Sequence, residues 1–270
     1  MNLETLSVSV AAGVGAIELN RPDKANAINQ QMWLDIRSAF CGMDEMAEVR
    51  VVVISGRGAH FTSGIDLAML AGLRSQIRDD CEGRTREKLR RTILDLQDTL
   101  SSIERCRKPV IAAIQGACVG AGIDLITCCD MRYAAAEAYF SVKEIDVGMT
   151  ADVGTLQRLP KLVPDGIVRE LAYTGRRFDG AEAKQIGLVN RIYDSPDDLR
   201  RGVAEIAATI AAKSPLSIRG IKEMLVYSRD HSVADGLNYI ATWNAAMLMS
   251  EDLSEAMIAA RDKRPAKFRD

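Results

Sequence analysis

The chain has 270 residues, of which 47% are hydrophobic and 27% charged, and its formal net charge at pH 7 is −2. This composition is typical of a soluble globular protein that can bury a substantial core. The near-neutral charge argues against nucleic acid as a partner, and the lack of about 20 unbroken apolar residues argues against a membrane span.

The cysteines and histidines restrict the chemistry further. Six cysteines without a CxxC pair indicate reduced thiols, and the N-terminal residues lack the pattern of a secretory signal. We therefore expect a cytoplasmic protein. Two histidines, His60 and His231, are too few for a multi-histidine metal site, so we expect no metal. Any catalysis should depend on carboxylates and backbone groups.

Strand and helix patterns alternate along the first part of the chain. Short apolar runs bounded by turn residues are typical of strands covered on both faces. The strand candidates are residues 15–19, 51–54, 110–114 and 188–192. Helical patterns lie between them, at residues 30–46 and around 89–103, where apolar residues recur every three or four positions. This alternation predicts an α/β core.

The pattern changes after residue 195. Residues 196–213, 215–227 and 233–261 all have helical character, with a break at Ser214-Pro215. We therefore expect two parts. Residues 1–195 should form the α/β core that carries the functional site, and residues 196–270 should form a helical C-terminal region.

Two glycine-rich turns follow predicted strands. They are GRGAHFTSGIDL, residues 56–67, and QGACVGAGIDL, residues 115–125. Unpaired N–H groups at a helix start can bind an anion or a developing oxyanion, and two facing turns could offer two donors to one carbonyl oxygen. Two ordinary tight turns explain the spacing equally well. A dinucleotide fingerprint does not fit, because Leu125 stands at the place of its third glycine.

Three acids stand in apolar surroundings: Asp124, Glu144 and Asp152. Singly, each allows a structural interpretation. Asp124 suits a helix N-terminus, and Asp152 could cap a helix expected at residues 155–162. If the three shared one dry pocket, burial and mutual repulsion would raise at least one pKa. One acid could then donate a proton and another accept one at neutral pH. The residues alone leave open whether they meet.

Several motifs occur in one order along nearly the whole chain. They include NRPDKANA at 20–27, FTSGIDL at 61–67, the segment 116–130, DVGTLQRL at 152–159 and KRP at 263–265. This succession resembles the enoyl-CoA hydratase/isomerase (crotonase) family. The resemblance implies a crotonase-like spiral of ββα units with a helical C-terminal region that assembles trimers, often paired into hexamers. It also implies an acyl-CoA substrate and no separate cofactor, because coenzyme A is part of the substrate.

The resemblance also implies roles for individual residues. The oxyanion-hole donors would be the backbone N–H groups of Ile65 and Ala121, although many relatives have glycine at the second position. Residues implied in binding substrate or coenzyme A are Lys24, Ala25 and Ala27 in an adenine-contacting turn, Ser63, Gly64 and Asp66 near the first donor, and Lys267 and Phe268 in the tail.

The acids separate the chemistries within this family. Hydratases carry glutamates at the places of Asp124 and Glu144 and a glycine-rich loop at Asp152. The present combination resembles the members that convert a 3,5-dienoyl-CoA into the conjugated 2,4-dienoyl-CoA in fatty acid β-oxidation. Glu144 would then serve C2 and Asp152 would serve C6, or the reverse, with Asp124 as their neighbour. The alternatives are a hydratase that adds water to a 2-enoyl-CoA and a non-catalytic acyl-CoA-binding scaffold.

Overall fold

The computed structural model describes residues 3–270, and its centre is a six-stranded sheet. The strands lie in the order β1 (Leu6–Ala11), β2 (Val14–Leu19), β3 (Val51–Gly56), β4 (Val110–Ile114), β6 (Met131–Ala135) and β9 (Arg191–Tyr193). Strands β1 and β2 form an antiparallel hairpin, and every later neighbour is parallel. A second sheet contains β5 (Ala117–Val119), β7 (Tyr139–Ser141) and β8 (Phe178–Asp179). The α/β prediction is therefore confirmed.

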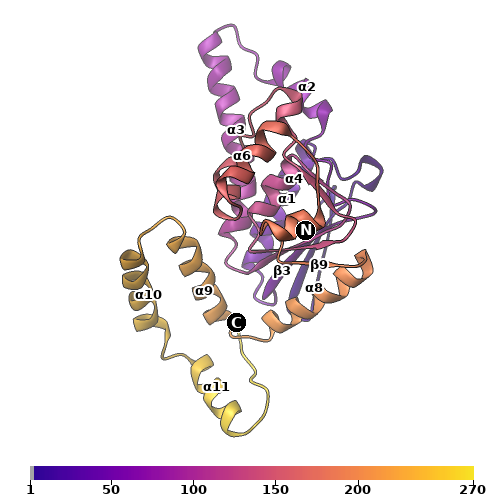
Figure 1. The fold of residues 1–270 in the computed structure, drawn as a ribbon. Coiled ribbons are helices and arrows are strands. Elements are labelled where there is room, and N and C mark those ends of the chain that lie inside the picture. The colour runs from indigo at the N-terminus through magenta and orange to yellow at the C-terminus, as the bar shows by residue number, and fades with distance from the viewer. Residues whose placement is uncertain (1–2) are drawn as a thin grey trace.

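Helices cover both faces of the large sheet (Figure 1). The strand residues alternate between two cores: Val52 and Ile54 belong to the core that includes α1 (Gln30–Glu45) and α3 (Glu82–Arg105), whereas Val51 belongs to the core beneath α8 (Pro196–Ala211). The other helices of this part are α2 (Leu67–Gln76), α4 (Ala121–Thr127), α5 (Thr155–Arg158), α6 (Asp165–Thr174) and α7 (Gly180–Gln185). Short 3-10 turns lie at η1 (Pro22–Lys24), η2 (Glu144–Val147) and η3 (Leu159–Lys161).

The last three helices project from this body (Figure 1). They are α9 (Pro215–Ser228), α10 (Val233–Met247) and α11 (Glu251–Arg261). The expected division at residue 195 stays a prediction, although the packing of α8 on the sheet favours a boundary nearer Ser214. No helix within residues 3–270 is both long enough and apolar enough to cross a membrane.

Three expected elements are wrong in their extent. The helix expected at 233–261 is two helices, because the Ser250 side chain accepts a hydrogen bond from Leu253 N and starts α11 anew. The helix expected at 155–162 shortens to α5 followed by η3, with Pro160 at the break. The strand expected at 188–192 begins at Arg191, because the Leu188 N–H donates to the helical carbonyl of Ala183.

A buried amide fixes the turn that follows β2. Asn26 is fully buried and has a φ of +53°, a conformation that asparagine tolerates better than most residues. Its Oδ1 accepts a hydrogen bond from Arg21 N at 2.9 Å, and its Nδ2 donates to the carbonyls of Arg57 at 2.9 Å and His60 at 2.8 Å. The amide therefore ties this turn to the loop that follows β3.

We expect Asn26→Ala to lower the free energy of unfolding by about 2–4 kcal/mol, because it leaves three backbone groups without partners. Urea denaturation at one fixed protein concentration measures the loss. The matched control is Asn238→Ala on the exposed face of α10, which should cost less than about 0.5 kcal/mol. Equal losses in the two variants would contradict the role of the buried amide.

Candidate active site

A cavity of about 630 Å³ lies beside the two glycine turns. Its apolar lining comes mainly from α1, α2 and α3, with Leu34, Met69, Leu70, Leu73, Leu89, Ile93 and Leu96. The same cavity is lined by Asp124, Glu144 and Asp152 and by Ile65 and Ala121. The structure therefore brings the three predicted acids and the two predicted donor residues to one apolar cavity.

Backbone hydrogen bonds hold the two glycine turns together. Thr62 N donates to the Ala117 carbonyl at 2.9 Å, and Val119 N donates to the Thr62 carbonyl at 3.1 Å. The contact is close enough to require glycine at residue 64, which has a φ of +94°. A methyl group there would lie 2.7 Å from the Val119 carbonyl oxygen and 3.6 Å from the Ala121 nitrogen.

The backbone N–H groups of Ile65, which follows Gly64, and of Ala121, which follows Gly120, have no hydrogen-bond partner within residues 3–270. Ala121 is the first residue of α4, where a helix leaves its N–H groups without internal partners. Ile65 is fixed on both sides by Ile28, whose N–H donates to the Gly64 carbonyl and whose carbonyl accepts from Asp66 N. Two free donors in fixed positions are suited to bind one carbonyl oxygen.

We expect Gly64→Ala to reduce turnover by roughly 100-fold or more, because the methyl group pushes the two donor turns apart. Steady-state kinetics on an acyl-CoA substrate measures the effect. Gly187→Ala is the matched control, since Gly187 has a similar φ of +86° but a methyl group there meets its nearest atom at 3.4 Å. Similar activity losses in both variants would indicate backbone strain rather than displaced donors.

Asp124 combines a structural contact with a free oxygen. Its side chain is fully buried, and Oδ1 accepts a hydrogen bond from Thr155 N at 2.6 Å. Its Oδ2 has no hydrogen-bond partner within residues 3–270. Burial, followed by the charge of Glu144, raises the pKa of Asp124 to about 7. Asp124 therefore caps α5, and the interpretation of Asp152 as the cap of this helix is wrong.

Glu144 and Asp152 are half-buried in the same cavity. Burial raises the pKa of Glu144, and the charge of Asp152 adds to the effect. Burial also raises the pKa of Asp152. No salt bridge within residues 3–270 joins any of the three acids to a cation, and Glu144 Oε2 lacks a hydrogen-bond partner there. The site therefore favours neutral carboxyl groups more strongly than water does.

We expect Asp124→Asn to flatten the dependence of stability on pH between about 4 and 7. The folded protein keeps a proton on Asp124 up to about pH 7, whereas the unfolded chain releases it near 3.8, so wild-type stability falls as the pH rises through this window. The asparagine keeps an acceptor for Thr155 N. Above pH 7 the variant should be more stable by up to roughly 4 kcal/mol, as measured by urea denaturation at pH 4.5 and 8.

The control for this pH dependence is Asp146→Asn, which changes an exposed acid that pairs with Lys143. It should leave the pH slope close to that of the wild type. An Asp124→Asn slope equal to that of the wild type would show that Asp124 ionises in the folded protein as it does in water.

The turn predicted to contact adenine lies next to the first glycine turn. Ser63 N donates to the Ala25 carbonyl at 2.9 Å, and Lys24 and Ser63 are exposed. The backbone of Ala27 is held from inside the turn, since its carbonyl accepts a hydrogen bond from Arg21 Nη1. Lys24, Ala25, Ala27 and Ser63 do not line the acid cavity, and their predicted role in binding stays a prediction.

Asp66 is already engaged within the chain. Its Oδ1 accepts from Ala68 N at 3.1 Å and caps α2, and its Oδ2 pairs with Arg21 Nη1 at 3.0 Å. The hydrogen bond from Arg21 lowers the pKa of Asp66. This carboxylate therefore has a structural role, and its predicted contact with substrate stays a prediction.

The tail residues Lys267 and Phe268 lie away from the acid cavity of their own chain. Lys267 N donates to Glu255, and the Phe268 carbonyl accepts from Arg50 Nη2 at 3.0 Å. Arg50 precedes β3, whereas the first glycine turn follows it, so the tail meets the opposite edge of the sheet. The predicted contact of these two residues with coenzyme A stays a prediction.

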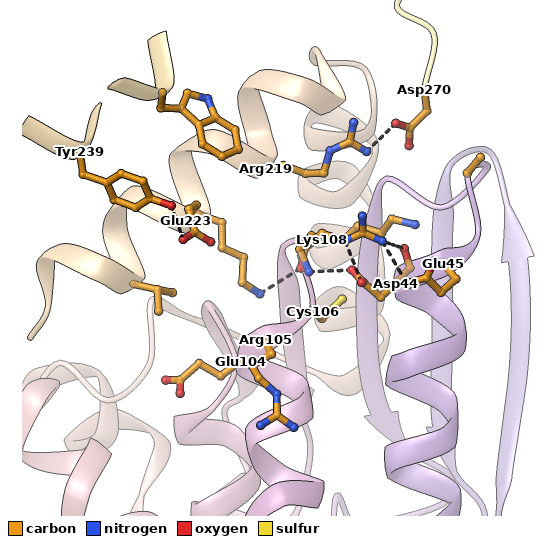
Figure 2. Close-up of a pocket in the computed structure, with 15 residues that line it drawn as sticks. Asp44, Glu45, Glu104, Arg105, Cys106, Lys108, Arg219, Glu223, Tyr239 and Asp270 are labelled. Carbon is orange, nitrogen blue, oxygen red and sulfur yellow. Dashed lines mark hydrogen bonds and ion pairs between the residues drawn. The ribbon is translucent and has the colours of Figure 1, made fainter. Parts of the chain in front are cut away.

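A larger cavity, of about 950 Å³, separates α9 and α10 from the ends of α1 and α3 (Figure 2). Its carboxylates are already paired. Asp44 accepts from Arg107, Asp270 pairs with Arg219, and Glu223 accepts a hydrogen bond from the Tyr239 hydroxyl (Figure 2). Each of these carboxylates therefore has a side-chain partner, whereas the acids of the smaller cavity pair with no cation within residues 3–270. We therefore assign the candidate active site to the smaller cavity.

Sequence reasoning missed the groups that support the acids. Gln97 on α3 donates from Nε2 to the Asp152 carbonyl at 2.6 Å, and the Thr155 N–H binds Asp124. Neither has a local signal, because Gln97 follows an ordinary apolar stripe and a backbone N–H is independent of residue type.

An α/β fold whose one apolar cavity holds three carboxyl groups without cations and two free N–H donors is typical of the class of enzymes that work by acid–base chemistry. The enoyl-CoA hydratase/isomerase profile matches residues 9–270, and the chain belongs to this family. The peroxisomal Δ3,5-Δ2,4-dienoyl-CoA isomerase of Arabidopsis thaliana is 46% identical over 267 residues, which cover 98% of this chain and 96% of that protein.

Two further relatives extend the comparison. The mitochondrial Δ3,5-Δ2,4-dienoyl-CoA isomerase of Homo sapiens is 45% identical over 93% of this chain and 77% of its own length. The solved structure of an enoyl-CoA hydratase from Bacillus anthracis has a TM-score of 0.89 at 30% identity, and covers 98% of this chain and 99% of its own. The predicted crotonase-like fold is thereby confirmed.

The predicted cytoplasmic location is contradicted by these relatives, which are named as peroxisomal and mitochondrial enzymes. The prediction came from charge, cysteine spacing and the lack of apolar spans. Those features reflect folding in water under reducing conditions and do not distinguish between compartments. Delivery is directed by short signals that contribute little to a fold.

Proposed function

We propose that this enzyme converts a 3,5-dienoyl-CoA into the conjugated 2,4-dienoyl-CoA. The observation that carries the proposal is the single apolar cavity lined by Asp124, Glu144 and Asp152 beside the unpaired N–H groups of Ile65 and Ala121. The relatives named as dienoyl-CoA isomerases support the same acyl-CoA isomerase activity. An acyl-CoA substrate is consistent with the family.

The reaction begins at the thioester. The N–H groups of Ile65 and Ala121 donate to the carbonyl oxygen and stabilise the negative charge that develops when Glu144 removes a proton from C2. The C2–H electrons form the C2=C3 bond, and the C3=C4 electrons move to C4=C5. The C5=C6 electrons then take a proton at C6 from Asp152. The substrate gains and loses one proton, so no oxidant or cofactor takes part.

The raised pKa values of Glu144 and Asp152 are compatible with one acid that donates a proton and one that accepts it. Asp152 must hold a proton at the start of the reaction, which its burial favours, whereas Glu144 must be ionised. If Asp152 were the base and Glu144 the acid, the same bonds would form and break. The charge of Glu144 raises the pKa of Asp124. Ionisation of Asp124 and Glu144 at the same time is therefore disfavoured, which keeps a proton within the group of acids.

The coenzyme A portion would bind at the mouth of the cavity, at Lys24, Ala25 and Ala27, with Ser63 and Gly64 beside the thioester. We further propose a trimer, alone or paired into a hexamer. Exposed apolar residues on α9 to α11 support such an assembly, among them Leu225, Leu237 and Met257. Lys267 and Phe268 would then act on the coenzyme A of a neighbouring copy rather than on that of their own chain.

The test is a spectrophotometric assay with a 3,5-dienoyl-CoA, in which the conjugated product absorbs strongly. The wild type should form product, and Asp152→Asn and Glu144→Gln should each lose it by roughly 100-fold or more, since each removes one proton-transfer group. A 2-enoyl-CoA serves as the parallel substrate. The Asp146→Asn variant controls for the loss of an acid outside the cavity.

Two results would overturn the proposal. Water addition to the 2-enoyl-CoA without dienoyl turnover would make the protein a hydratase. Binding of acyl-CoA that is unchanged in both variants, without turnover of either substrate by the wild type, would make it a binding scaffold.

A further inference from the structure

The segment that carries Asp152 has few attachments to the rest of the chain. Within residues 3–270, the backbone groups of residues 150–153 take part in one hydrogen bond, which Gln97 Nε2 donates to the Asp152 carbonyl at 2.6 Å. A backbone that is otherwise unbonded depends on this contact for its position, together with the packing of the buried Ala151 and Val153 side chains.

Helix α3, which carries Gln97, also contacts the chain after Asp152. Ser101 and Glu104 lie one and two turns after Gln97 on α3, and both bind Arg158 of α5, at 3.1 Å from Ser101 Oγ and 3.2 Å from Glu104 Oε2. The Arg158 guanidinium packs against Gly154, where a methyl group would lie 2.2 Å from Nη1. Residues 97, 101 and 104 share one face of α3, so this face contacts both Asp152 and the short helix α5 that follows it.

A neighbouring face of α3 lines the cavity. Leu89, Ile93 and Leu96 belong to the apolar lining, and Gln97 directly follows the last of them. An acyl chain packed on these residues therefore rests on the helix that holds Asp152. One element, α3, therefore contacts both the Asp152 backbone and the space that an acyl chain would fill.

We propose that Gln97 is a positioning residue for Asp152, and that its hydrogen bond to the main-chain carbonyl places the Asp152 carboxylate at the reacting segment of the substrate. This inference rests on the proposed isomerase function. Gln97 itself takes no part in proton transfer.

The experiment separates the two proton transfers by running the reaction in D₂O. Deuterium uptake at C2 and at C6 is followed by mass spectrometry and NMR, together with the rate of isomerisation. Asp152→Asn first identifies which carbon Asp152 serves. Gln97→Met, which keeps the length of the side chain but cannot donate, should then reduce isomerisation by roughly 10- to 100-fold through kcat, because a displacement of about 1 Å has effects of this size.

The pattern of exchange distinguishes positioning from general damage. Gln97→Met should slow exchange at the carbon that Asp152 serves and leave exchange at the other carbon near the wild-type rate, with KM nearly unchanged. Gln97→Glu, a second variant of the same shape that lacks the donor when ionised, should show the same split. Gln157→Met is the matched control, since it makes the same replacement at an exposed position on α5.

Equal losses of exchange at both carbons, or wild-type isomerisation in both Gln97 variants, would overturn the role of Gln97. Failure of the proposed function has a different signature, because the wild type itself would then form no 2,4-dienoyl-CoA.

Discussion

The site depends first on the hydrogen bonds between Thr62 and the segment 117–119, which hold the two glycine turns against each other. The turns follow β3 and β4, which are adjacent and parallel, so the sheet delivers both to the same edge. An unpaired N–H is costly in a protein interior, and two residues with such groups, Ile65 and Ala121, line the cavity. Under the proposed function, a thioester carbonyl would supply the acceptor that these two N–H groups lack.

The second constraint is electrostatic. Three carboxyl groups line an apolar cavity, and within residues 3–270 no cation pairs with them. A salt bridge would stabilise each ionised form and make proton donation difficult, as it does for Asp66 beside Arg21. Burial without a partner has the opposite effect. The cost is limited at Asp124 because its Oδ1 accepts the Thr155 N–H, which also gives α5 its cap.

The sequence predicts the parts of the site that have local signals. The strand patterns at 51–54 and 110–114, the glycine turns after them, and acids in apolar surroundings can all be recognised from residue types. Contacts that depend on tertiary geometry cannot. The contact between Arg21 and the carboxylate of Asp66, which lie 45 residues apart in the sequence, is one of them. The hydrogen bond from Arg50 to the Phe268 carbonyl, which ties the tail to the start of β3, is another.

The number and placement of the acids bear on the choice between isomerase and hydratase. Water addition takes place at two neighbouring carbons, so a compact pair of acids around one water molecule is sufficient. The dienoyl shift moves a proton between carbons four bonds apart, and a rigid conjugated segment cannot bring both ends to one short carboxylate. Glu144 lies on the turn after β7. Asp152 lies on a separate loop that is hydrogen-bonded to α3, so the two acids are positioned by different elements. Asp152, the acid to which the proposed function gives the second proton transfer, therefore lies on a segment that α3 contacts, and α3 also lines the cavity.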